Sequence, residues 1–214
     1  MKLASPEKVA GDVCESLQSN LLPRVFERLP INKRLLILDV GAAIASTVNF
    51  LNQFKCRLSF CDLYAEDFVA RPSAVATHEE RVSQFRQALN LEAGTKVDIC
   101  LFWDLFSYLD GAGLRALMEA LDSHIGRDTL GYSIGVHHAD APLPFMQYGI
   151  ERPSQVRQVY RAGIQSRVFP RSQRDLHHLL GYFEIEKCCL LADGRVEYLL
   201  LENRHHDTKP QLTF

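Results

Sequence analysis

The stretch Arg34-Leu35-Leu36-Ile37-Leu38-Asp39-Val40 is a continuous apolar run that closes with an acid and is followed by Gly41. A run of this length without polar alternation is typical of a strand buried on both faces, as in parallel sheets. Glycine directly after a strand lets the backbone turn tightly and approach a ligand closely. We therefore predict a buried parallel strand over residues 34–40 and assign the rest of the fold around it.

Strand and helix patterns alternate after this run. Apolar runs predict strands over residues 57–61, 97–102, 129–136, 183–191 and 195–202, with a further weak strand within 64–76. Helical spacing predicts helices around 48–54, over 79–91 and 114–125, and from the cap Ser172 to Leu180. This alternation indicates an α/β fold, a doubly wound and mostly parallel sheet of about seven strands. Asp193-Gly194 is a hairpin signal, so the last two strands are expected to be antiparallel.

We divide the chain into an N-terminal helical extension (1–32), an α/β domain (33–202) and a polar tail (203–214). Val9, Val13, Leu17 and Leu21 recur every four residues, which predicts an amphipathic helix from Ser5, with a second short helix over 24–29. These N-terminal helices either pack on the core or cover a ligand site. Residues 139–171 contain four prolines and few apolar repeats, and we interpret them as an insertion with a short helix near 155–160.

The composition excludes several classes of protein. Of 214 residues, 47% are hydrophobic, and 24 basic against 26 acidic residues give a net charge of −2. These values argue against disorder, fibrous structure and a polybasic binder of membranes or nucleic acid. No apolar run of ~18 residues and no signal-like segment occurs, so we expect a cytoplasmic protein without membrane contact. Six cysteines without CxxC or zinc-ligand spacing predict reduced thiols in the core and no metal site.

Polar residues follow three predicted strands, at Asp39 with Gly41, at Asp62, and at Trp103 with Asp104. In a doubly wound sheet, ligands bind outside the carboxyl ends of the strands, where the strand order reverses. Asp62 follows Asp39 at about the 20-residue spacing of an acid that hydrogen-bonds a ribose diol. Each residue also has a structural alternative: the acids can cap turns or helices, and Trp103 can be a packing residue.

These segments resemble the class I S-adenosylmethionine-dependent methyltransferases. Residues 36–45 are similar to the family's glycine-rich first motif, 58–63 to its ribose-binding segment, and 97–109 to its fourth-strand motif. The terminal hairpin is similar to its reversed last strand. The resemblance implies a seven-stranded sheet with S-adenosylmethionine bound over the first two strand ends.

The resemblance also implies roles for single residues. Asp39, Gly41 and Ala43 would lie near the methionine part of the cofactor, and Asp62 would hold the ribose. Trp103 or Asp104 would line the cleft in which the methyl group is transferred. Tyr108 and His137 are candidate contacts for the methyl acceptor, and each is also a candidate general base.

Two positions depart from the family pattern. Ala43 and Ala45 stand where the family has its second and third glycines, and each added methyl group disfavours a positive φ. Two functions therefore remain open. One is S-adenosylmethionine-dependent methyl transfer to an unidentified small-molecule or protein acceptor. The other is a catalytically inactive binding or regulatory module with the same fold.

Six arginines lie within or next to the insertion, with aromatic residues between them: Arg152, Arg157, Arg161, Arg167, Arg171 and Arg174. Arg157 and Arg161 share one face of the predicted short helix, where they either pair with the acidic body or contact a partner or acceptor. A base-amine acceptor on nucleic acid is not favoured, because the fourth-strand motif lacks the Asn/Asp-Pro-Pro-Tyr sequence. His137 and His138 do not predict a metal site, because adjacent residues of a strand point to opposite sides.

Overall fold

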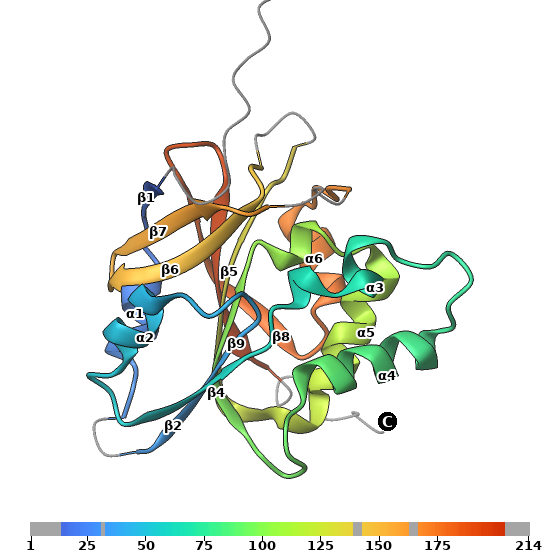
Figure 1. Ribbon diagram of the computed structural model, residues 1–214, viewed down its shortest axis with the longest axis horizontal. Coiled ribbons are helices and arrows are strands. Elements are labelled where there is room, and N and C mark those ends of the chain that lie inside the picture. Colours follow the sequence, from blue (N-terminus) through green and yellow to red (C-terminus); the bar gives the residue numbers. More distant parts are fainter. Residues whose placement is uncertain (1–13, 31–32, 139–142, 163–166, 204–214) are drawn as a thin grey trace, which may run out of the picture.

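Two β-sheets organise the chain in the computed structural model, which describes residues 14–30, 33–138, 143–162 and 167–203 (Figure 1). The main sheet has six strands in the order β3-β2-β4-β5-β9-β8, and the small sheet has the order β1-β7-β6. The strands of the main sheet are β2 (Leu35–Asp39), β3 (Cys56–Phe60), β4 (Val97–Trp103), β5 (Ile125–Gly135), β8 (Phe183–Leu190) and β9 (Val196–Glu202).

The main sheet is parallel over four strands and ends in an antiparallel hairpin. β2 pairs in parallel with β3 and β4, and β4 pairs in parallel with β5. β9 runs antiparallel to both β5 and β8. In the turn between β8 and β9, Gly194 has a φ of +86°, a left-handed conformation that favours glycine. The predicted α/β fold with a C-terminal hairpin is confirmed.

The main sheet has six strands rather than the predicted seven. The weak strand predicted within residues 64–76 is wrong, because a 3-10 turn at Leu63–Ala65 leads there into the short helix α3 (Asp67–Ala70). Asp67 lies in the first turn of α3, where its charge favours a helix. Pro72 follows and has no N–H to donate to a strand ladder. β3 therefore forms one edge of the main sheet.

Helices cover both faces of the main sheet. They are α1 (Leu22–Glu27), α2 (Ala45–Leu51), α4 (His78–Leu89), α5 (Gly111–Leu121) and α6 (Gln173–Leu179), in addition to α3. Leu36 and Leu38 of β2 belong to a core that includes residues of α3 to α6. Leu35 and Ile37, which alternate with them, belong to a second core that includes α1, α2 and the small sheet. The strand over the opening apolar run is thus buried on both faces, as predicted.

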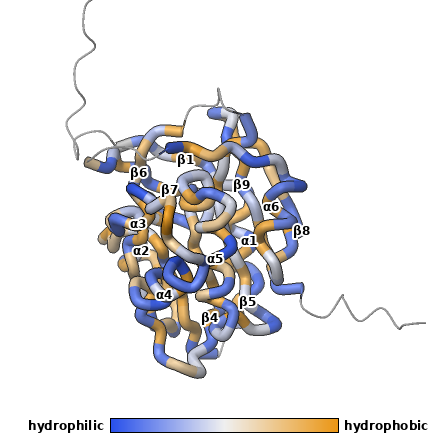
Figure 2. The backbone as a smooth tube through the Cα atoms, turned by 90° about the vertical axis from the view of Figure 1, so that its right-hand side faces the viewer, coloured by the Kyte–Doolittle hydropathy of each residue, from blue (hydrophilic) through white to orange (hydrophobic). Residues whose placement is uncertain are grey.

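Reciprocal capping boxes fix the beginnings of α4 and α6. The Thr77 hydroxyl accepts a hydrogen bond from the Glu80 N–H, and the Glu80 carboxylate accepts one from the Thr77 N–H. Ser172 and Asp175 form the same capping box at α6, which confirms Ser172 as the predicted cap. α4 is mostly hydrophilic along the side that faces the viewer in Figure 2, while its buried residues face the core.

The helix predicted over residues 5–21 is wrong for Cys14–Gln18, which form the strand β1. β1 pairs antiparallel with β7 from Cys14↔Val159 to Gln18↔Gln155, so a partner distant in sequence overrides the local helical spacing. Residues 1–13, which include Val9 and Val13, lie outside the described part of the chain. The second predicted helix exists as α1, with Pro23 in its tolerated first turn.

The insertion forms a β-hairpin. β6 (Met146–Arg152) pairs antiparallel with β7 (Gln155–Tyr160), so the helix predicted near residues 155–160 is wrong. Along β7, buried Val156 and Gln158 alternate with exposed Arg157, which is the period of a strand. The hairpin packs its apolar side into the second core through Met146, Tyr148 and Ile150.

A buried carboxylate fastens the N-terminal segment to the main sheet. Glu197 of β9 is fully buried and accepts a hydrogen bond from the Ser19 hydroxyl at 2.7 Å and from the Tyr132 hydroxyl at 3.0 Å. Its other oxygen accepts the backbone N–H groups of Asn20 at 2.7 Å and Leu21 at 3.1 Å. The turn between β1 and α1 is therefore held by the last strand of the main sheet.

The cysteines whose side chains the structure describes are free thiols: Cys56, Cys61, Cys100, Cys188 and Cys189. Cys100 is buried in the core as predicted, whereas Cys188 is exposed on the edge strand β8. None of the helices in the described ranges has the length and apolar character that crossing a membrane would require.

Candidate functional site

The carboxyl ends of β2 and β3 bring Asp39, Gly41 and Asp62 together, and we call these three residues the acidic cradle. β2 lies between β3 and β4, so the chain leaves it to one side for β3 and returns on the other side for β4. This reversal of strand order is the place where doubly wound sheets bind ligands. Cys61 N–H donates to the Asp39 carbonyl at 3.1 Å, which holds the two strand ends side by side.

Asp39 has two carboxylate oxygens in different surroundings. Its Oδ1 accepts hydrogen bonds from the Gly41 N–H at 2.9 Å and from the Trp103 indole Nε1 at 2.7 Å. Its Oδ2 is buried and has no hydrogen-bond partner. Burial raises the pKa of Asp39 to about 7, although both hydrogen bonds act to lower it. Asp39 thus has an acceptor atom in the cradle that the protein itself does not use.

Trp103 fills the space above Gly41. It is fully buried and has a φ of 49°, a left-handed conformation that costs a bulky residue about 1–2 kcal/mol. A Cβ atom added at Gly41 would lie 3.3 Å from the Trp103 ring. The indole also stacks on Tyr148 of β6, with ring centroids 5.3 Å apart and planes 10° apart. Trp103 therefore joins the acidic cradle to the inserted hairpin.

Asp104 is the centre of a buried polar network. It accepts hydrogen bonds from the Tyr64 hydroxyl at 2.6 Å and the Tyr148 hydroxyl at 2.7 Å. Burial raises its pKa to about 6, while these two hydrogen bonds act to lower it. Arg195, which pairs with Asp193, donates to the Tyr148 hydroxyl at 2.9 Å. The network fixes Tyr148 in place from two sides.

Arg161 pairs with Asp62 through both of its terminal nitrogens. Its Nη2 lies 2.8 Å from Asp62 Oδ1, and its Nη1 donates to Asp62 Oδ2 at 3.0 Å. The guanidinium also lies over the Tyr64 ring, 4.7 Å from its centroid, and 5.6 Å from that of Phe145. Only 7% of the Arg161 side chain is exposed. Arg161 therefore covers the carboxylate that is expected to hold a ribose.

The inserted hairpin sits directly on the beginning of α2. The Ile150 N–H donates to Thr47 Oγ1 at 3.0 Å. A Cβ atom at Gly149 would lie only 2.4 Å from Ser46 Oγ, so glycine is required for β6 to approach the helix this closely. The hairpin thus lies over the loop that follows β2.

The other predicted site residues do not join the acidic cradle. Ala43 is exposed in the loop before α2. Tyr108 is buried, with ring contacts to Tyr64 and Phe145. His137 is half-buried, with its ring 3.9 Å from that of His138. No group of three potential metal ligands occurs among the described residues.

The arginines of the insertion have different roles, and the shared helical face predicted for Arg157 and Arg161 is wrong because β7 is a strand. Arg157 is exposed and lies 3.6 Å from Glu151, whereas Arg161 covers Asp62. Arg171 is buried and donates to the carbonyl groups of Phe106 and Leu109. The positive charge of this segment is therefore divided between solvent and the interior.

Three functional candidates were not found by sequence reasoning: Tyr64, Tyr148 and Arg195. Tyr64 follows Asp62 by two positions in a segment expected to be irregular, and Arg195 lies in a turn that was explained by Asp193-Gly194 alone. Tyr148 stands out only as one of the aromatic residues among the arginines. Their shared feature, contact with Asp104 or with each other, depends on the tertiary structure.

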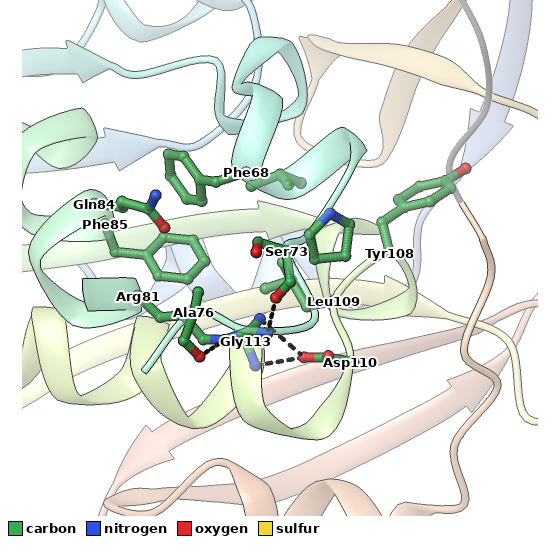
Figure 3. A pocket seen from close by; sticks show the side chains of 12 residues that line it. Phe68, Ser73, Ala76, Arg81, Gln84, Phe85, Tyr108, Leu109, Asp110 and Gly113 are labelled. Carbon is green, nitrogen blue, oxygen red and sulfur yellow. Dashed lines mark hydrogen bonds and ion pairs between the residues drawn. The ribbon is translucent and has the colours of Figure 1, made fainter. Parts of the chain in front are cut away.

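A separate cavity of about 190 Å³ lies between α3, α4 and the beginning of α5 (Figure 3). Phe68 and Phe85 form its apolar wall, in an edge-to-face pair with centroids 5.0 Å apart. Arg81 and Asp110, whose charged atoms are 3.8 Å apart, lie at its polar side. Tyr108 also lines it, so the cavity shares one side chain with the aromatic cluster around Tyr64.

No protein-family model matches the chain, and neither does any curated protein. Solved structures do match. The pyocyanin biosynthetic protein PhzM is 16% identical, with a TM-score of 0.46 over 85% of this chain and 54% of PhzM, so the chain spans about half of its length. A putative type 11 methyltransferase from Sulfolobus solfataricus is 15% identical, with a TM-score of 0.49 over 89% of this chain and 95% of that one.

An S-adenosylmethionine-dependent methyltransferase from Clostridium acetobutylicum is also similar. It is 15% identical, with a TM-score of 0.46 over 84% of this chain and 87% of its own. At these identities, and with TM-scores below 0.5, the similarity concerns the general course of the chain. It does not by itself assign a cofactor or an activity.

Proposed function

We propose that this protein binds S-adenosylmethionine at the acidic cradle and transfers its methyl group to a small molecule. The observation that carries the proposal is the position of Asp39, Gly41 and Asp62 at the carboxyl ends of two adjacent parallel strands. They lie where the strand order reverses, which is where this architecture binds nucleotide-like ligands. The similarity to structures described as methyltransferases agrees with this assignment.

The chemistry of the cradle suits this cofactor. The Asp62 carboxylate has two oxygens that can accept hydrogen bonds from a ribose diol. Asp39 Oδ2, which has no partner, accepts a hydrogen bond from the cofactor's ammonium group when Asp39 is ionised. The cofactor supplies an already activated methyl group, so the protein mainly has to align donor and acceptor away from water.

The space of the cradle is taken by the protein's own side chains. Trp103 lies over Gly41, and Arg161 neutralises Asp62. The side chains of Trp103 and Arg161 must move away from the cradle before a cofactor can enter. The same observation favours a second candidate function, an inactive binding module with a permanently closed cradle.

The proposed acceptor is a small and largely apolar molecule. The cavity next to Tyr108 has a volume of about 190 Å³ and an aromatic wall, and its Arg81 and Asp110 side chains offset each other's charge. A neutral lining of this kind suits an uncharged ring system better than a phosphorylated or acidic acceptor.

Calorimetry with S-adenosylhomocysteine tests the proposed cofactor site. We expect the wild-type protein to bind, and Asp62→Ala to weaken binding at least about tenfold because the diol loses charge-assisted hydrogen bonds. Asp67→Ala is the matched control, because Asp67 is an exposed acid on the neighbouring α3, and it should bind as the wild type does. Absence of binding at millimolar ligand in the wild type would contradict the proposal and favour the inactive module.

A further inference from the structure

We infer that Trp103, Tyr148 and Arg161 form an internal plug that competes with the cofactor, with Arg161 as its releasable latch. The inference rests on the proposed function, because it assigns the ligand with which the plug competes. The plug joins the end of β4 to the inserted hairpin and occupies both halves of the cradle. Ligand binding is thereby coupled to a rearrangement of the protein's own side chains.

Arg161 imitates a ligand at the ribose end of the cradle. Its guanidinium donates a hydrogen bond from Nη1 to Asp62 Oδ2, brings Nη2 within 2.8 Å of Asp62 Oδ1 as an ion pair, and rests on the Tyr64 ring. The Asp62 side chain keeps 32% of its surface exposed, so it stays solvated when Arg161 leaves. Releasing Arg161 would be very costly if it left Asp62 as a buried charge without a partner. The exposure of Asp62 avoids this cost.

Trp103 closes the other end, over Gly41. Its indole N–H uses Asp39 Oδ1, while Asp39 Oδ2 stays without a partner. The left-handed backbone of Trp103 is strained, and strain of this kind persists where the surrounding structure enforces it. Here the indole is held by its stack on Tyr148, which is fixed in turn by Asp104 and Arg195.

Arg161 is the part of the plug that can leave at the lowest cost. It lies just after β7, beyond the last ladder pair Met146↔Tyr160, and its N–H is bonded to the Phe145 carbonyl. Its side chain can turn into solvent by changing rotamers while every backbone hydrogen bond of the hairpin stays in place. Tyr148, in contrast, is buried in the second core. We therefore assign the latch to Arg161 and the fixed part of the plug to Tyr148.

Only molecules in which the latch is open can bind the cofactor. The apparent affinity is therefore the intrinsic affinity multiplied by the fraction of molecules in which the latch is open. Removing Arg161 should tighten S-adenosylhomocysteine binding about tenfold, the effect of a state that is about 90% closed in the wild type. Arg157→Ala is the matched control, because Arg157 belongs to the same hairpin but is exposed and reaches only Glu151. It should leave the affinity unchanged.

The experiment measures S-adenosylhomocysteine binding by calorimetry for the wild type, Arg161→Ala, Arg161→Gln and Arg157→Ala. Arg161→Gln keeps most of the side-chain length without the charge, so it serves if the alanine variant does not fold. Salt gives a second readout: because only 7% of the Arg161 side chain is exposed, raising the ionic strength should tighten binding to the wild type modestly, and not to the Arg161 variants. Trp103, the only tryptophan, gives a third, because ligand binding should shift its emission to longer wavelength as the indole loses its buried stack.

The outcomes separate this inference from the proposed function. Tighter binding to both Arg161 variants, with Arg157→Ala unchanged, supports the latch. Equal or weaker binding to the Arg161 variants, with clear binding to the wild type, overturns the latch and leaves the proposed function intact. An unchanged tryptophan emission in a protein that binds the ligand overturns the part of the plug assigned to Trp103. Absence of binding by every variant at millimolar ligand overturns both proposals.

Discussion

Asp39 shows how one side chain at the acidic cradle responds to pH. Its pKa is raised from 3.8 to about 7 by burial, so the folded protein holds a proton that the unfolded chain loses above about pH 4. The stability contributed by this proton is complete below the unfolded pKa and is lost as the pH rises through the folded pKa. Asp104, with a pKa raised to about 6, acts in the same direction.

We expect the free energy of unfolding to fall between about pH 4 and pH 7, and to change little above that from these two groups. Within the window where only the folded form is protonated, each such group contributes up to about 1.4 kcal/mol per pH unit. Asp39→Asn should flatten the fall, because the amide keeps an acceptor for Gly41 and Trp103 and does not titrate. Urea denaturation at four pH values measures this, with Asp128→Asn, an exposed acid, as the control. An equally steep fall in Asp39→Asn would contradict the assignment.

The predicted residues of the site differ in how far their surroundings could be inferred. Asp39 and Asp62 follow apolar strands directly, so their position at one edge of the sheet is predictable from local patterns. The orientation of Trp103 is not, because its indole stacks on Tyr148 of a hairpin that lies more than forty positions later. Likewise, the pairing of Arg161 with Asp62 depends on β7 being a strand.

Among the elements, the turn between β1 and α1 depends most on a single side chain. Glu197 accepts hydrogen bonds from two hydroxyl groups and two backbone N–H groups there. We predict that Glu197→Ala lowers the free energy of unfolding by about 3–5 kcal/mol, because several buried donors lose their acceptor. Hydrogen exchange should show that the amides of Asn20 and Leu21 lose protection.

Glu197→Gln provides the internal comparison for this prediction. Its amide oxygen still accepts hydrogen bonds, so the loss should be smaller and the two backbone amides should stay partly protected. Equal losses for both substitutions would show that the negative charge, rather than the number of acceptors, holds the segment.

The elements that could be predicted are those defined by local burial. β2 and β4 are buried on both faces and give unbroken apolar runs, and α4 carries its own cap. β1 gives no such signal because its partner β7 lies far along the chain, and β7, which pairs with both β1 and the adjacent β6, has a spacing of arginines that also fits a helix. Leu17 and Leu21 have helical spacing, yet one lies in β1 and the other in the following turn. In the N-terminal segment, strand pairing with a distant partner therefore outweighs the helical spacing of the local sequence.

At the scale of the whole molecule, the two sheets share one core. Tyr148 and Ile150 of the small sheet lie in the same cluster of buried residues as Ile99, Leu101 and Trp103 of the main sheet. We predict that both sheets unfold in one transition, because neither can expose this cluster alone. Trp103 emission, which reports on the junction, and far-ultraviolet circular dichroism, which reports on the helices and strands, should give the same midpoint in urea. Two separate midpoints would show that the small sheet is an independent unit.

The long-range fastening of the N-terminal segment has a consequence for synthesis on the ribosome. Ser19 and Glu197 are 178 residues apart, so the segment that is translated early cannot be fixed until the last strand has emerged. During that interval the apolar side chains of β1 and α1, such as Leu17, Leu22 and Val25, lack the part of their core that β9 supplies through Leu199. At ~5–20 residues per second, the delay lasts on the order of ten seconds or more. The nascent chain is therefore expected to be a client of chaperones that bind exposed apolar segments, and to aggregate when it is released before β9 is complete.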